Sequence, residues 1–131
     1  MDIREFAEKF IEAEEAAFQR GEFKALEELE DPNVVYHMGP VGDLVGREAH
    51  KQDILGTRQA TTDLQQEFKY LTGDGNVFAI TYTSSCRFTS EKPGFPIPIG
   101  KRISGDYLFV VQVKNGKITE GWLNGSINIT D

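Results

Sequence analysis

The fold is most clearly indicated by residues 103–129, which read ISGDYLFVVQVKNGKITEGWLNGSINI. Two runs rich in β-branched and aromatic residues, 103–113 and 118–129, flank the turn sequence KNGK at residues 114–117. Asn-Gly pairs supply the positive φ angles of a tight turn, and β-branched and aromatic residues favour strands. We therefore expect the two runs to pair as an antiparallel hairpin.

A second hairpin precedes the first. Residues 64–71 and 77–89 have the same strand composition and are joined by Gly73-Asp74-Gly75-Asn76, which favours a tight turn. Residues 91–100 follow and hold three prolines, which cannot donate hydrogen bonds to a sheet. We expect this segment to be a loop that folds over an apolar surface.

The N-terminal part of the chain is predicted to be helical. Apolar residues recur there at three- and four-residue steps and form one stripe on a helix, namely Ile3, Phe6, Ala7, Phe10, Ile11, Ala17 and Phe18. Asp2 is placed to cap this helix at its start, and Gly21 can adopt the left-handed conformation that ends it. Its other side is acidic and is interpreted as a solvated face.

Two further helices and a short strand complete the first half. A second helix with Phe23, Leu26 and Leu29 inward is expected to stop before Asp31-Pro32, because the residue before proline avoids the helical conformation. A short strand over residues 34–38 and a link containing Gly39, Pro40 and Gly42 are expected next. Helical spacing returns from Arg47 to about Gln59.

Length, composition and charge exclude several classes of function. The 131 residues, 39% of them apolar, suit one domain over 1–131 with its own core. The net charge is −7, and the whole acidic excess lies in residues 1–31, so nucleic acid and anionic membranes are disfavoured as partners. The single Cys86 and the absence of an apolar leader favour the cytoplasm. His37, His50 and Cys86 have no metal-ligand spacing, so no metal is expected.

The order of elements and two local motifs resemble the NTF2-like superfamily, and within it the SnoaL-like group of polyketide cyclases. The motifs are Gly46-Arg47-Glu48-Ala49-His50, at the start of the third helix, and the segment NGKITEGW, residues 115–122, in the last hairpin. The resemblance implies an α+β cone: a curved, six-stranded, mostly antiparallel sheet with three helices in the N-terminal half. It also implies a hydrophobic pocket, chemistry without a cofactor, and a homodimer through the outer sheet face.

This chain lacks part of the set of catalytic residues that well-understood members of the family use. The resemblance implies an aspartate thirteen residues before the tryptophan, as in cyclases of the family, but this chain has Phe109 at that position. Asp106 lies three residues earlier and is expected on the opposite face, because strand side chains alternate. Ketosteroid isomerases of the superfamily carry an acid near the exit of the first strand, where this chain has His37 to Pro40. Their helical tyrosine is also missing.

His50 and Asp53 are the remaining catalytic candidates. They lie at i and i+3 on one helix face, where the carboxylate can orient the imidazole of a general base. They replace two positions that are apolar in the relatives that the chain resembles. The alternative is a rotated helix that leaves both side chains in solvent, and on spacing alone this alternative is favoured about two to one.

The ligand pocket is predicted from strand phases. The apolar phase of each strand contributes one or two residues to an enclosed space: Tyr36, Met38, Tyr82, Phe109 and Trp122. Asn124 shares a phase with Trp122 and Ile118 and would add a polar group, whereas His37 alternates with Tyr36 and is expected outside.

The outer face of the sheet is expected to carry Thr81, Thr83, Ser85 and Arg87 and to form the dimer interface. Two functions follow for the domain as a whole. One is a cofactor-free isomerase, cyclase or lyase for a small apolar carbonyl compound, using His50 and Asp53. The other is a non-catalytic ligand-binding or protein-interaction domain.

Overall fold

The computed structural model describes residues 2–130, which form helices and strands in the predicted order. Within these residues the helices are α1 (Ile3–Arg20), α2 (Lys24–Leu29) and α3 (Arg47–Ala60), with a short 3-10 turn η1 (Gly39–Val41). The strands are β1 (Glu30–His37), β2 (Asp43–Val45), β3 (Thr61–Asp74), β4 (Val77–Phe88), β5 (Arg102–Lys114) and β6 (Lys117–Thr130). The prediction of an α+β fold with three helices is confirmed.

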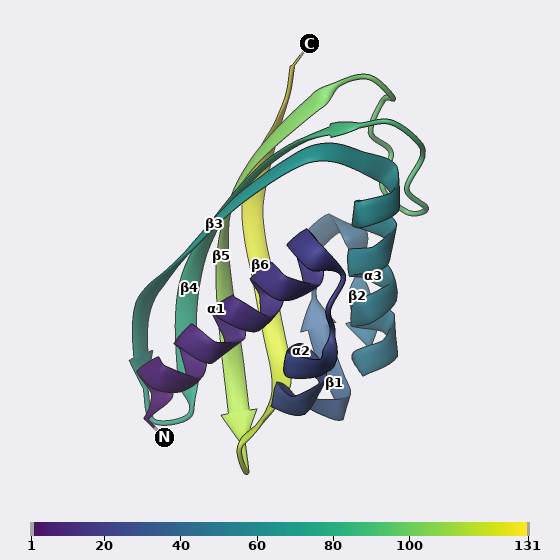
Figure 1. The fold of residues 1–131 in the computed structure, drawn as a ribbon. Helices are drawn as coiled ribbons and strands as arrows, with labels where there is room; N and C mark the ends of the chain where they lie inside the picture. The colour runs from purple at the N-terminus through teal and green to yellow at the C-terminus, as the bar shows by residue number, and fades with distance from the viewer. Residues whose placement is uncertain (1, 131) are drawn as a thin grey trace.

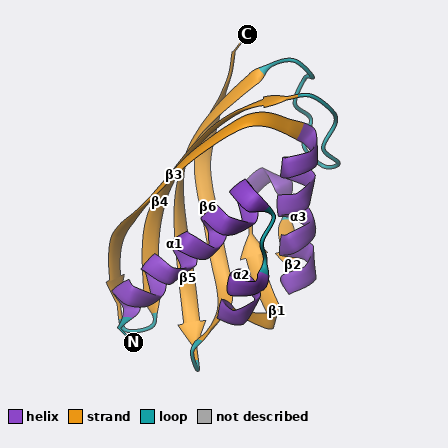
Figure 2. Cartoon of the chain, viewed as in Figure 1, coloured by secondary structure: helices purple, strands orange, loops and turns teal. Residues whose placement is uncertain are grey.

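The strands form one six-stranded sheet in the order β2-β1-β6-β5-β4-β3. All neighbours are antiparallel except β1 and β6, which are parallel and bring the two halves of the chain together. The sheet is strongly curved, and the helices lie on its concave side (Figure 1). Figure 2 shows that the helices are confined to this side, so the sheet and helices enclose a cone.

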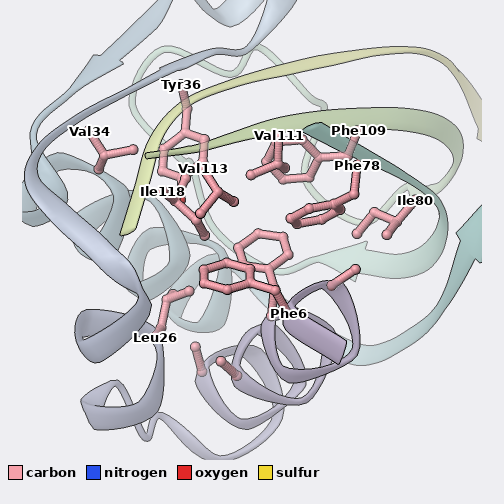
Figure 3. Packing of buried hydrophobic residues seen from close by; sticks show 14 of the residues in the cluster. Phe6, Leu26, Val34, Tyr36, Phe78, Ile80, Phe109, Val111, Val113 and Ile118 are labelled. Atoms are coloured by element: carbon pink, nitrogen blue, oxygen red, sulfur yellow. The ribbon is translucent and has the colours of Figure 1, made fainter. Parts of the chain in front are cut away.

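Helix α1 lies across the concave face, as its apolar stripe predicts. The Asp2 carboxylate accepts a hydrogen bond from the Glu5 N–H at 2.8 Å, and Gly21 ends the helix with a φ of 68°. The Phe10 ring lies 5.8 Å from the ring of Phe78 and 5.7 Å from that of Phe109. These contacts between helix and sheet form the centre of the core (Figure 3).

The strand boundaries differ from the sequence prediction in several places, and β3, for example, spans residues 61–74 and not 64–71. Strand β1 begins at Glu30 and not at residue 34, because Pro32 lies where the pairing of β1 with β6 is irregular and the sheet needs no N–H from it. Residues 43–45 were predicted as part of a link. They form β2, because three residues are enough to pair with residues 35–37 at the edge of β1.

The proline-rich loop over residues 91–100 covers a second apolar cluster, as predicted. This cluster contains Cys86 and Phe88, and the ring of Phe95 from the loop stacks 5.7 Å from that of Phe88. The Lys92 ammonium fixes the loop to α3 by a 2.9 Å hydrogen bond to the hydroxyl of Thr57. The loop therefore closes one end of the cone.

Candidate functional site

A histidine on α3 and a glutamate at the start of β1 meet inside the cone. His50 is only 3% exposed, and its Nδ1 lies 2.6 Å from Oε2 of Glu30, which is also buried. The Tyr36 hydroxyl donates a 2.5 Å hydrogen bond to the same Glu30 oxygen, and the Tyr36 and His50 rings lie 4.3 Å apart. One carboxylate oxygen therefore fixes the orientation of both rings.

Helix α1 adds a second buried carboxylate. Glu14 is 2% exposed, and its Oε1 lies 3.6 Å from Nε2 of His50. Its Oε2 has no hydrogen-bond partner among the described residues. A buried carboxylate oxygen without a partner is costly, because it loses its hydration without a replacement. We name Glu14, Glu30, Tyr36 and His50 the carboxylate–imidazole cluster.

The cluster shifts the proton affinities of its members. Burial, together with the nearby charges of Glu30 and Asp53, raises the pKa of Glu14 from 4.5 to about 7, against the opposing charge of His50. Burial lowers the pKa of His50, but the charge of Glu14 and the hydrogen bond to Glu30 outweigh it and raise that pKa above 6.5. Burial and then the Glu30 charge raise the pKa of Tyr36 well above its usual value.

These shifts give the cluster one group that exchanges its proton near neutral pH. A carboxyl group with a pKa of about 7 is half protonated at pH 7, so it can act either as acid or as base. The charge of Glu14 and the hydrogen bond to Glu30 raise the pKa of His50, so the cationic form of the imidazole is favoured more than in an isolated histidine. A carboxyl group and an imidazole that can each exchange a proton thus lie side by side in an apolar interior.

Asp53 is not the partner of His50, so the predicted pair is wrong in that respect. His50 points inward, which excludes the solvent-facing alternative for this residue. Asp53 lies one turn nearer the proline-rich loop, and its Oδ1 is 2.9 Å from the Lys92 ammonium. Helix spacing cannot predict this contact, because Lys92 comes from a distant loop. The Lys92 ammonium holds the Asp53 carboxylate at the edge of the cone.

The predicted pocket residues fall into two groups. Tyr36 and Phe109 are buried in the main core, with Met38 packed against it. The Tyr82 ring stacks 4.6 Å from that of Phe68 and 5.1 Å from that of Tyr107, further along the concave face. Around Tyr36 and Phe109 the interior is filled by aromatic and aliphatic side chains (Figure 3).

Trp122 and Asn124 lie on the other face of the sheet, so their assignment to the pocket is corrected. The pairing register shifts between Ile118 and Glu120, and the extra residue reverses the phase of β6 beyond it. The Trp122 ring consequently stacks 5.7 Å from the ring of His37. Asn124 pairs with the exposed Leu108 on the outer face.

His37 and Asp106 take the outward positions predicted for them. The His37 ring nitrogens lie 2.9 Å from Asp43 Oδ1 and 2.6 Å from Glu120 Oε2, and these two hydrogen bonds raise the pKa of His37. Asp106 is exposed and pairs with Thr83 across β4. Asp106 therefore cannot replace the missing acid at Phe109.

Glu14 and Glu30 were missed by the sequence analysis. Glu14 lies four residues after Phe10 and seven after Ala7, which places it on the inward face of α1. A charged residue at a core position of an amphipathic helix was the available signal, and the analysis counted only apolar residues on that face. Glu30 gave no comparable signal, because it lies at the boundary between a helix and a strand.

The surface of the described residues is hollowed between α2 and α3, where the volume is about 610 Å³. Another hollow, of about 350 Å³, is lined by β3, β4 and β5. Among residues 2–130, no group of three histidine, cysteine or carboxylate side chains is arranged to hold a metal ion. None of the helices in the same range is long and apolar enough to span a membrane.

Comparisons with known proteins agree with this architecture. Residues 8–124 match the family described as SnoaL-like polyketide cyclase. No curated protein sequence matches significantly. Among solved structures, TsrD from Streptomyces laurentii is similar over 96% of this chain and 92% of its own, with 20% identity and a TM-score of 0.79.

Two other solved structures illustrate the range of similar proteins. SalBIII, described as an epoxide hydrolase/cyclase-like enzyme in pyran ring formation in the polyether salinomycin, has 19% identity, 98% coverage of both chains and a TM-score of 0.72. Bal32a, from a soil-derived mobile gene cassette, has 23% identity, covers 93% of this chain and 89% of its own, and has a TM-score of 0.67. At these identities the similarity establishes the fold.

Proposed function

The chain belongs to the SnoaL-like polyketide cyclase family, and from this premise we propose that it catalyses a cofactor-independent acid–base reaction on a small apolar carbonyl compound. Isomerisation, cyclisation and elimination all begin with the same step, the removal of a proton from a carbon next to a carbonyl group. The observation that carries the proposal is the buried Glu14 carboxylate, which has one unpartnered oxygen beside His50. Stability alone does not favour such a group.

Glu14 is assigned the role of general base. Its Oε2 takes the proton from the substrate carbon, the C–H electron pair forms the C=C bond of an enolate, and the carbonyl π pair moves to oxygen. The pKa of about 7 makes Glu14 a stronger base than an ordinary carboxylate while leaving it half ionised at neutral pH. Return of the proton to another carbon completes an isomerisation. In a cyclisation the enolate carbon attacks a second carbonyl, whose π pair moves to its oxygen, and that alkoxide takes the proton back from Glu14.

His50 is assigned the stabilisation of the enolate oxygen. Its Nδ1–H donates to Glu30, which leaves the Nε2–H of the imidazolium as a donor toward the same space as Glu14. Glu30 and Tyr36 are assigned as positioning residues, because Glu30 accepts the hydrogen bonds that orient the Tyr36 hydroxyl and the His50 ring. Entry of a ligand requires the packing of the cone to open, since Glu14 and His50 are both buried.

The proposed chemistry can be tested by proton–deuterium exchange. The wild-type protein is incubated in D₂O with apolar β-diketones or unconjugated enones, and loss of the α-proton signal is followed by ¹H NMR. We expect accelerated exchange that rises with pH through about 7, because the carboxylate form of Glu14 is the base. Glu14→Gln should abolish the acceleration, and His50→Gln should reduce it.

Glu15→Gln is the matched control, because Glu15 is the exposed neighbour of Glu14 on the same helix. It should leave exchange unchanged. The rival function, a non-catalytic binding domain, predicts that such compounds raise the melting temperature without accelerating exchange. Equal exchange rates in the wild type and Glu14→Gln would reject Glu14 as the base.

A further inference from the structure

The surface hollow between α2 and α3 is lined by an unusual set of charges. Its walls carry four cationic side chains, Lys24, Arg47, Lys51 and Lys117, and two carboxylates, Glu27 and Glu28. Four positive and two negative charges give the hollow a net charge of +2, in a chain whose net charge is −7. We call this hollow the α2–α3 groove; the elements that line it, α2, α3 and β6, are labelled in Figure 1.

The cations of the groove are held in place without being neutralised. The Arg47 guanidinium donates to the backbone carbonyl of Glu27 at 3.1 Å, and the Lys117 ammonium donates to that of Glu28. A carbonyl satisfies a donor but carries no net charge. Among the described residues, no carboxylate lies within 4.0 Å of the charged groups of Arg47 or Lys117, and the same holds for Lys24.

Lys51 is the only groove cation near a carboxylate, and that contact is weak. Its ammonium lies 3.9 Å from Glu27 Oε1 and 5.3 Å from the centroid of the Phe23 ring. An exposed ion pair at this distance contributes little, so most of its charge also remains available to a ligand. Phe23 forms the apolar part of the wall and is itself buried.

We propose that the α2–α3 groove binds a small phosphate-bearing molecule, a phosphate monoester. Four cations that line one hollow and include an arginine suit a compact dianion, because a guanidinium can pair with two phosphate oxygens and ammonium groups add point charges. A volume of about 610 Å³ is within the range of small-molecule sites and larger than a bare phosphate needs. Six of the eight lining residues are charged, which distinguishes this ligand from an apolar compound in the cone.

The groove adjoins the carboxylate–imidazole cluster without sharing a residue with it. Arg47 and Lys51 flank His50 on α3, and Glu30 follows α2 directly, so each wall of the groove is continuous with one member of the cluster. A bound phosphate would bridge α2 and α3. The proposal of a phosphate site rests on the charges and the volume of the groove, and it does not depend on the proposed reaction.

An NMR titration with inorganic phosphate and glycerol 3-phosphate tests the proposal. The ¹⁵N-labelled protein is titrated at pH 8 and constant ionic strength, with sodium acetate and sodium chloride as separate arms. We expect saturable shifts of the Lys24, Arg47 and Lys117 amide signals with both phosphates, tighter with the ester. Acetate binding as tightly as phosphate would overturn the assignment of a dianion.

Lys117→Gln and Lys114→Gln form a matched pair for this titration. Both lysines are exposed and flank the turn, Lys114 as the last residue of β5 and Lys117 as the first of β6, but only Lys117 lines the groove. We expect Lys117→Gln to weaken phosphate binding about fivefold and Lys114→Gln to leave it unchanged. Equal weakening by both variants would show a non-specific ionic effect, and the absence of saturation in the wild type would exclude the site.

Discussion

Replacement of Glu14 by glutamine should make the protein more stable at neutral and alkaline pH. A folded-state pKa above the unfolded value means that the folded protein prefers the neutral carboxyl group. The stability associated with that neutral form is fully present below pH 4.5 and is lost as the pH rises through about 7. Glutamine has a similar shape and never ionises, so Glu14→Gln removes the loss.

The rise of the Glu14 pKa from 4.5 to about 7 sets the magnitude. At about 1.4 kcal/mol per pH unit, ionisation of Glu14 costs the folded state about 3 kcal/mol at pH 8. Glu14→Gln should therefore raise the free energy of unfolding by up to about 3 kcal/mol at pH 8 and by less than about 0.5 kcal/mol at pH 4.5. The shift in melting temperature at pH 8 should be about 10 °C.

Urea denaturation between pH 4.5 and pH 8.5 measures this difference. Glu15→Gln serves as the control on the exposed side of α1 and should show no pH-dependent gain. A Glu14→Gln variant that is less stable than the wild type at pH 8 would refute the reasoning. A gain that is the same at every pH would also refute it, because the gain must follow the ionisation of Glu14.

Three further predictions concern the core, a close backbone approach and the assembly. Phe10→Ala should lower the free energy of unfolding by about 3–5 kcal/mol in urea, because Phe10 is 0% exposed; a loss below about 1 kcal/mol would contradict the packing. Gly121→Ala should cost about 1–3 kcal/mol in the same assay, because its Cβ would lie 2.6 Å from Tyr36 and 2.9 Å from Phe109. Sedimentation should show twice the 14.7 kDa mass, with Leu108→Arg restoring the monomer; a wild-type monomer at micromolar concentration would exclude the outer-face dimer.

The fold was predictable because local and long-range signals agree. The stripe on α1, with Asp2 and Gly21 at its ends, defines one helix, and the Gly-rich turns at residues 73–76 and 114–117 fix two hairpins. The alternation of strand side chains gave a wrong prediction where one extra residue shifts the pairing register. The register shift before Glu120 moved Trp122 to the outer face, and nothing in a strand of alternating residues marks that shift in advance.

The candidate site was predictable only in part. Helix spacing identified His50 as a candidate but favoured a solvent-facing position for it, whereas the structure buries it. Its partners come from α1 and the start of β1, at sequence separations that no local pattern connects. The inward position of Glu14 could have been predicted from the helical period of α1 alone. Asp53 pairs with Lys92, which comes from the proline-rich loop. This pairing was not predictable, because the position of the loop depends on the surface that it covers.

The place of β6 in the sheet has a consequence for the order in which the domain can fold. Strand β6 lies between β1 and β5, and it pairs residues such as Tyr36 and Gly121 that are far apart in sequence. Helix α1 and the hairpin of β3 and β4 can form from local contacts, whereas β1 joins the rest of the sheet only through β6, the last strand. During synthesis the Phe-rich face of α1 stays exposed until β4 and β5, which carry Phe78 and Phe109, are available, and this makes early intermediates prone to chaperone binding and aggregation.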